Sequence, residues 1–487
     1  MSPGSPAPGP AASGRAGGDG LPPPQDVVEQ ALAAAAPGSD HCLVIVEETS
    51  EVEVRYANNT TTTNGSRRDR RVTVISMRQV DGGMAAGVAR RGGDVGIPEL
   101  VAAAEQDASE SPPADDAFAL LVPGDAHASS GSGRRFDEPP DSTELSVLSE
   151  VLTGLSHSFG RARRGGHVLA GFAEHRRTTE YLGTSTGIRL AHAQPQGALH
   201  LVARSADGAD STWAGAGTTD FADVSVEELH AGLEQRLAWA ARRVEQPAGR
   251  YEVLLPPSAV SDLMVSLAYE LSGRNAEDGR TVFSRPGGGT RVGEQLSPLP
   301  FDLRSDPGEP GLTCSPFLTT TSSSADTSVF DNGLRLDRTD WIAGGMLERL
   351  RYHRAGAARS GTAAAGFIGN LSLELDGATG SLDELVARTE RGLLLTCLWY
   401  IREVDPATML LTGLTRDGVY VVEDGKVVGA SNNFRFNESP VDLLARVTEV
   451  GTSVRSLGRE FGEYFNRTRM PAVRVPDFNM SSVSQAS

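Results

Sequence analysis

The chain has 487 residues, a formal net charge of −18, and 39% hydrophobic and 22% charged residues. This length suits two or three domains, and the composition is typical of a globular protein. The negative charge argues against nucleic acid or an anionic membrane surface as a partner, because both repel an acidic protein. Three widely spaced cysteines indicate no disulfide framework, and the lack of a long apolar run or a signal-peptide pattern predicts a cytoplasmic protein without membrane spans.

The predicted fold class is α+β with two domains, the first of which is an α/β sandwich-like domain over residues 25–245. It follows a stretch, 1–24, of Gly, Pro, Ala and Ser with too few large apolar side chains to fold, which predicts a disordered tail. Apolar and polar residues alternate over 41–47 and 50–56, which indicates two strands. From 106 to 141 the composition changes to Ser, Gly, Pro and Asp, which indicates a long mobile connection.

The second domain, residues 246–487, is predicted to be mostly antiparallel β structure with flanking helices. Its first helix is expected over 258–272, where apolar residues recur at helical spacing. A short closing strand is expected over 473–475, near the end of the chain.

A group of short apolar runs in this domain predicts an antiparallel meander between two capped helices. The first helix opens at Ser381, which begins a capping-box pattern, and the second opens at Ser439, which is followed by proline. Asp-Pro and Asp-Gly pairs separate the runs and favour tight turns. Such a sheet buries one face and offers its other face or its edge to a partner. The runs are 393–401, 409–414, 419–422 and 427–430.

The same stretch resembles a known family. The sequence GLLLTCLWYIREVDPATMLLTGLTRDGVYVVEDGKVVG, followed by NNFRFNESP, is similar to the C-terminal signature of the TldD/PmbA family of metallopeptidases and their partner subunits. The resemblance extends from about Asp26 to the end of the chain. In catalytic members of the family, a His-Glu-x-x-x-His segment on a helix of the second domain binds zinc through its histidines, and the Glu serves as general base.

By position, the corresponding helix here is 258–272, which reads SAVSDLMVSLAYELS and has no histidine. One alignment places Val265, Ser266 and Glu270 at the three motif positions, and a register shifted by one residue stays open. Valine is not a metal ligand, so we expect no zinc cofactor in this chain. All nine histidines are scattered, and no two stand at the helical spacing that metal ligands need.

Other residues near the meander are candidates for holding a peptide. Cys397 could face a cleft, although a buried apolar thiol is the favoured interpretation without histidine partners. Asn432 and Asn433 carry donors and acceptors that suit an extended peptide backbone, and a hydrogen-bonded loop is at least as good an interpretation. Charged residues near the turns form either an ion-pair network or a cavity mouth. The full set of chamber-lining candidates is Cys397, Trp399, Arg402, Arg416, Asn432, Asn433 and Arg435.

The resemblance implies that this chain is the non-catalytic (TldE/PmbA-type) subunit of a heterodimer. Its zinc-bearing TldD-type partner would supply the catalytic site, and together the two would degrade or trim unstructured peptides. Leu395 and Trp399 are expected to face that partner, whereas Glu423 at a hairpin tip is not. Two alternatives remain open, namely a stand-alone peptide-binding or regulatory protein, including a homodimer, and an active hydrolase with an unrecognised site.

Overall fold

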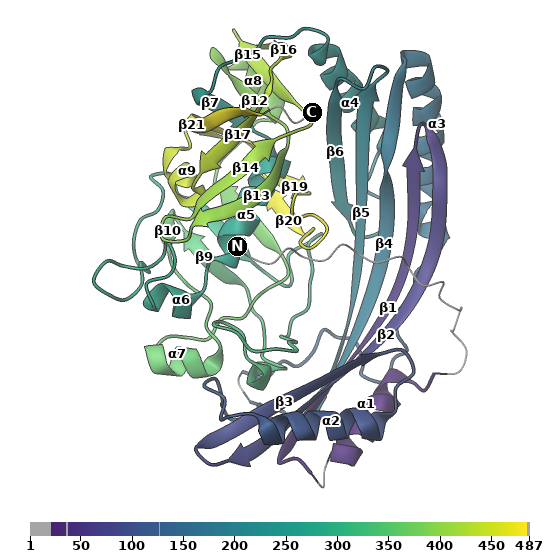
Figure 1. Cartoon of the computed structure of the whole chain (residues 1–487), viewed down its shortest axis with the longest axis vertical. Helices are drawn as coiled ribbons and strands as arrows, with labels where there is room; N and C mark the ends of the chain where they lie inside the picture. Colours follow the sequence, from purple (N-terminus) through teal and green to yellow (C-terminus); the bar gives the residue numbers. More distant parts are fainter. Residues whose placement is uncertain (1–20, 36–37, 126, 485–487) are drawn as a thin grey trace.

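The computed structural model describes residues 21–35, 38–125 and 127–484, so most of the predicted tail, 1–24, lies outside the described residues. It has an α+β architecture with three sheets, one in the first half of the chain and two in the second (Figure 1). None of the helices in these ranges is long and apolar enough to cross a membrane.

The first sheet is fully antiparallel, with strand order β3-β2-β1-β4-β5-β6. The two strands expected over 41–47 and 50–56 are one continuous strand, because the polar residues between them pair across the sheet without interruption. The strands are β1 (His41–Ala57), β2 (Thr60–Val80), β3 (Gly83–Gly92), β4 (His167–Thr184), β5 (Arg189–Ser205) and β6 (Ser211–Thr218).

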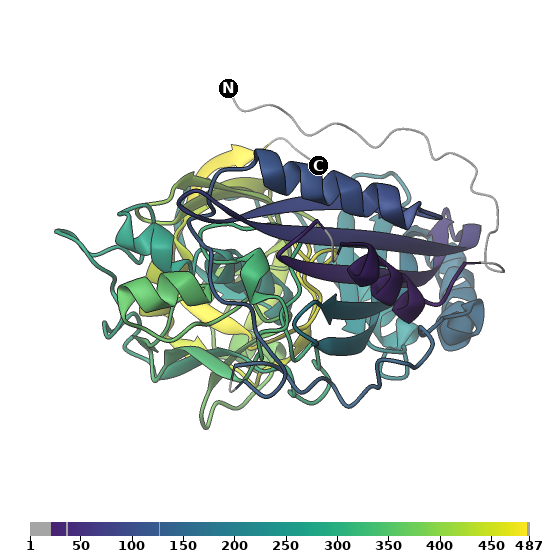
Figure 2. The ribbon, with the colours of Figure 1, turned by 90° about the horizontal axis from the view of Figure 1, so that it is seen from below.

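Four helices cover one face of this sheet. They are α1 (Pro24–Ala35), α2 (Ile97–Glu110), α3 (Ser149–Gly165) and α4 (Val226–Ala240), and Figure 2 shows α1 and α2 from below. Val44 of β1 packs with α1 and α2, and Val52 packs with α3 and α4. Side chains alternate along a strand, so these even-numbered residues share one face. Leu43 and Ile45 point to the other face and pack against residues 314–368 of the second half.

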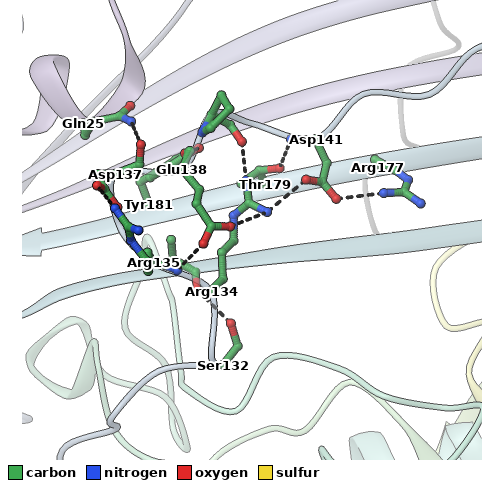
Figure 3. A network of polar contacts seen from close by, with 12 residues as sticks. Gln25, Ser132, Arg134, Arg135, Asp137, Glu138, Asp141, Arg177, Thr179 and Tyr181 are labelled. Carbon is green, nitrogen blue, oxygen red and sulfur yellow. Dashed lines mark hydrogen bonds and ion pairs between the residues drawn. The ribbon is translucent and has the colours of Figure 1, made fainter.

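The segment expected to be a mobile connection, 106–141, is anchored to the first sheet. It starts inside α2 and then runs along the sheet with little regular structure. The Tyr181 hydroxyl donates to the carbonyl oxygen of Glu138 (2.7 Å), and the Asp141 amide donates to Thr179 Oγ1 (3.0 Å) (Figure 3). The Asp141 carboxylate also pairs with Arg177 at 2.8 Å. These contacts attach the segment to β4, and its mobility stays a prediction from composition.

The second half contains two sheets with one helix, α5 (Pro257–Tyr269), between them. Side chains of α5 share a single apolar cluster with strands of both sheets. The smaller sheet has the order β10-β9-β8-β11-β20-β19. Its strands are β8 (Phe301–Ser305), β9 (Thr339–Ala343), β10 (Met346–Leu347), β11 (Leu371–Leu375), β19 (Val454–Ser456) and β20 (Thr468–Met470).

The larger sheet has the order β13-β14-β17-β21-β7-β12-β15-β16, with β18 attached to β21. Its strands are β7 (Gly249–Leu255), β12 (Arg391–Leu395), β13 (Leu398–Asp405), β14 (Leu410–Thr415), β15 (Val419–Glu423), β16 (Lys426–Ala430), β17 (Asn433–Glu438), β18 (Glu449–Val450) and β21 (Val473–Ser484). Short helices complete this half: α6 (Gly273–Glu277), α7 (Arg354–Ser360), α8 (Leu382–Ala387) and α9 (Pro440–Arg446).

The expected meander is not a simple one. The apolar run 393–401 is divided into β12 and β13, which do not pair with each other. Instead, β7 and the C-terminal strand β21 lie between the hairpin β13–β14 and the hairpin β15–β16 in the sheet. The expected short closing strand is therefore a central strand of twelve residues. The flanking caps agree with the sequence: Ser381 forms a capping box with Glu384, and the Ser439 hydroxyl accepts the amide of Asp442.

Strand β3 lies in close contact with α2 at Gly87, so a substitution at this residue tests the packing of α2 on the first sheet. A Cβ atom at this position would lie 2.0 Å from the backbone nitrogen of Ala108, which cannot move without displacing α2. We expect Gly87→Ala to destabilise the chain by about 1–3 kcal/mol or more, as overpacking does. The measurement is the midpoint of urea unfolding.

Gly65→Ala in the neighbouring strand β2 is the matched control, since nothing lies within 4 Å of an added Cβ there. An unchanged midpoint for Gly87→Ala, or an equal loss in both variants, would show that the close packing of α2 on β3 is incorrect.

Candidate functional site

Helix α5, which carries the positions of the family's zinc motif, is buried along almost its whole length. Val265 is 2% exposed and belongs to the core between the two sheets. The Ser266 hydroxyl donates to the carbonyl oxygen of Asp262, one turn earlier on the same helix (2.9 Å). Among the described residues, no group of metal-ligating side chains includes a residue of α5. The side chains on this helix therefore contribute mainly to packing between the two sheets.

Glu270, the third motif position, lies at the C-terminal end of α5 and is half-buried. Burial raises the pKa of its carboxyl group, the charge of Glu403 raises it further, and Arg351 lowers it. Arg351 is already paired with Asp326 at 2.7 Å and lies over the ring of Phe367. The Glu270 carboxylate therefore lies near Arg351, whose charge is already paired with Asp326.

The buried carboxylate of Asp262 organises the loop that follows β19. It accepts three backbone N–H groups, from Arg459 (2.8 Å), Glu460 (3.0 Å) and Phe461 (3.1 Å). Burial raises the pKa of Asp262 to about 7, and the three N–H groups lower it. A Cβ atom at Gly458 would lie 2.3 Å from Asp262 Oδ1, so only glycine permits this approach. The loop 457–461 is thereby fixed to α5.

This loop connects the two halves of the chain through Arg459. The guanidinium lies 4.4 Å from the ring centre of Trp399 on β13 and 5.4 Å from that of Trp213 on β6. An arginine between two aromatic faces gains cation–π attraction from both. The Trp213 indole nitrogen faces His200 Nδ1 at 3.4 Å, and burial lowers the pKa of His200 to about 4, so its neutral ring can accept that hydrogen bond.

The apolar run 393–401 placed Cys397 within a strand, but in the structure Cys397 lies in the break between β12 and β13. It is 1% exposed, and burial raises the pKa of its thiol well above the usual range. A protonated, enclosed thiol is neither a nucleophile nor a ready metal ligand. The backbone amide of Arg416 donates to the carbonyl oxygen of Cys397 (3.2 Å), which closes this break.

Arg402 belongs to an ion pair at the exposed edge strand β13. Its guanidinium contacts Glu460 at 3.0 Å and lies 4.5 Å from the ring centre of Tyr400. The Tyr400 amide donates to the same Glu460 carboxylate (2.8 Å). Tyr400 has a positive φ of 56°, which this hydrogen bond helps to hold. The loop fixed by Asp262 therefore also fixes the conformation of β13.

The amide residues lie at a different place, between the two halves. Asn432 Oδ1 accepts the amide of Gln246 (3.0 Å), and Asn433 Oδ1 accepts from the Thr415 hydroxyl (3.2 Å). Both line a cavity of about 200 Å³ that also includes Asp417. Arg435 is exposed on β17 and is not part of this cavity. The predicted chamber residues are thus divided between the β12–β13 break, the interdomain cavity and the outer surface.

Sequence reasoning missed Asp262, Arg459 and Trp213. The one available signal was an acidic residue within the otherwise apolar run AVSDLMV, since a buried carboxylate requires donors from elsewhere in the fold. Together, the hydrogen bonds of Asp262 and the ring contacts of Arg459 hold the loop 457–461 in place beside Trp213 and Trp399. The residues on α5 and in the β12–β13 break do not combine a nucleophile with a base.

Comparisons with known proteins found one matching family model and several similar folds. Residues 248–482 match the family model described as the PmbA/TldA metallopeptidase C-terminal domain. No curated protein sequence matches the chain.

The similar solved structures share the fold over almost the whole chain at low sequence identity. TldE from Thermococcus kodakarensis has a TM-score of 0.74 at 17% identity, covering 93% of this chain and 99% of its own. A protein from Thermotoga maritima has a TM-score of 0.73 at 17% identity, with 93% and 99% covered. A protein from Bacteroides thetaiotaomicron has a TM-score of 0.72 at 13% identity, covering 94% of this chain and 99% of its own. The names of the Thermotoga and Bacteroides proteins describe each as a proposed modulator of DNA gyrase.

The structural likenesses establish the fold, and the family model covers the part of the chain that carries α5 and the larger sheet. Residues 248–482 are thus similar to the C-terminal domain of the PmbA/TldA metallopeptidases, and the chain as a whole shares the fold of the three solved structures.

Proposed function

We propose that this chain is the non-catalytic, TldE-type subunit of a heterodimeric zinc metallopeptidase that acts on unstructured peptides. The observation that supports this most directly is the composition and burial of α5. Val265 and Ser266 stand where the resemblance places a zinc ligand and the general base, and both are packed into the core. A peptidase of this kind needs an open metal position and a bound water, so the catalytic zinc is assigned to the partner.

The partner is expected to dock at the edge strand β13. This strand pairs only with β14 in the described sheet, so it is an edge strand that a further strand could join beyond the Tyr400 amide, which Glu460 already binds. Tyr400 and Val404 on it are 56% and 58% exposed, which is unusual for large apolar side chains at a sheet edge. Leu395, the partner-facing residue expected from the sequence, is fully buried in the core, and Trp399 holds Arg459. The proposed interface therefore rests on Tyr400 and Val404 of β13 in place of Leu395 and Trp399.

The size of the interdomain cavity supports a shared peptide chamber. Its volume of about 200 Å³ is smaller than the roughly 300–1,000 Å³ of typical ligand pockets, so it can hold little more than one side chain. Asn432 and Asn433 at its wall are already engaged with the protein's own loops. At this place an extended peptide needs more space than the cavity offers, and the second subunit would complete that space.

The first experiment concerns activity and partnership together. The tagged full-length chain is isolated from its native host, and co-purifying proteins are identified by mass spectrometry. We expect a relative that carries the His-Glu-x-x-x-His segment. We also expect unfolded peptides to be cleaved by the complex, cleavage to stop on addition of a chelator, and no cleavage by the isolated chain.

Peptide cleavage by the isolated chain would contradict the non-catalytic assignment. Recovery of no such relative, with tight binding of unfolded peptides by the chain alone, would instead support the stand-alone peptide-binding protein.

The second experiment maps the docking edge. Val404→Asp and Tyr400→Asp place a charge on the exposed side of β13 without entering the core, and we expect each to weaken partner binding at least about ten-fold. Glu423→Lys, at the exposed end of β15 near the opposite edge of the same sheet, is the matched control. Binding is measured by pull-down and titration, with circular dichroism to verify folding. Wild-type binding by both folded β13 variants, or a loss confined to Glu423→Lys, would place the interface elsewhere.

A further inference from the structure

Three side chains able to hold a metal ion converge in the first half of the chain, outside the site described above. His167 begins β4, whereas His230 and Glu234 lie one turn apart on α4. The Nε2 atoms of the two histidines are 2.8 Å apart. Glu234 Oε1 lies 3.5 Å from His230 Nε2 and 3.9 Å from His167 Nε2.

The size of this triangle matches the coordination distances of zinc. For three atoms with these separations, the point equidistant from all of them lies about 2 Å from each. Zinc keeps about this distance from both imidazole nitrogen and carboxylate oxygen. Two histidines and one glutamate also form a recurrent zinc ligand set, in which water takes the fourth position.

The surrounding residues orient these ligands. His230 is fully buried and His167 is 8% exposed, while the Glu234 side chain is 28% exposed and leaves one approach from solvent. Arg161 of α3 binds Glu234 Oε2, so the other oxygen, Oε1, is directed at the imidazoles. The Asn59 side chain fixes the backbone on both sides of His167: its amide donates to the His167 carbonyl oxygen (2.8 Å), and its oxygen accepts the Leu169 amide (2.7 Å). Outer partners of this kind are typical of metal sites.

A simple hydrogen bond between the two rings explains less. It would account for the 2.8 Å separation of the Nε2 atoms, but it gives Oε1 of Glu234 no role, since this atom is too far from His167 for a hydrogen bond and at the limit from His230. An ion at the centre of the triangle would contact all three atoms at once.

We propose that His167, His230 and Glu234 bind a divalent transition-metal ion, with zinc the best match to this nitrogen and oxygen donor set. These two histidines are 63 residues apart in sequence, and only the fold brings them together. The ion connects the start of β4 to α4. Further along, α4 reaches the second half, where Trp239 at the end of the helix packs against Tyr420 of β15. The ion would therefore stabilise the packing of β4 against α4, and the proposal does not rest on the proposed peptidase role.

The test uses the tag-free full-length chain, stripped of metal with a chelator and then titrated with Co²⁺ and Zn²⁺. We expect one ion per chain, a visible cobalt spectrum of the four-coordinate type, and displacement of cobalt by zinc. His167→Gln and Glu234→Gln each remove one ligand with little change in volume, and each should weaken binding by about ten-fold or more. In the wild type, excess zinc should raise the melting temperature by several degrees, and this shift should vanish in both variants.

His157→Gln is the matched control, because His157 of α3 and Glu227 of α4 form an exposed histidine–glutamate pair, 3.4 Å apart, outside the proposed site. It should bind the ion as the wild type does. The absence of saturable binding in the wild type would overturn the proposal. So would undiminished binding in either folded ligand variant, or an equal loss in His157→Gln. Since the wild-type titration is decisive by itself, misfolding of one variant leaves the outcome clear.

Discussion

The Asp262 carboxylate is buried between two sheets, and the loop that supplies its hydrogen bonds connects several parts of the structure. A charged or polar group removed from water requires hydrogen-bond partners, and here they are three consecutive backbone amides of the loop 459–461. That requirement fixes glycine at 458, where the loop approaches the helix. It also carries Arg459 into the space between Trp213 and Trp399, and so joins the two halves of the chain.

The same loop determines the shape of the exposed edge. Glu460 binds the Tyr400 amide and the Arg402 guanidinium, so the conformation of β13 depends on a carboxylate located on α5. The helix α5 itself contributes to the packed core between the sheets and holds this loop in place.

Local patterns in the sequence were reliable where a single stretch of chain decides the outcome. The caps at Ser381 and Ser439 form as their spacing predicts, because each cap involves residues only three positions apart. The helix expected over 258–272 is α5, which ends three residues earlier. The lack of histidine on it is likewise a property of the sequence. By contrast, the composition of 106–141 gave no sign of the hydrogen bonds that attach this segment to β4, because their partners are distant in sequence.

The sequence by itself determined the class of fold, the family resemblance and the missing motif, since each depends on residue types within short windows. The tertiary structure alone decided the strand order of the larger sheet, where β21 inserts beside β7, and the contact of Asp262 with a loop almost 200 residues away. It also decided the meeting of His167 with His230. The physical reason is common to all three: each contact closes a long loop, and only the burial gained by the whole fold offsets the entropy lost in closing it.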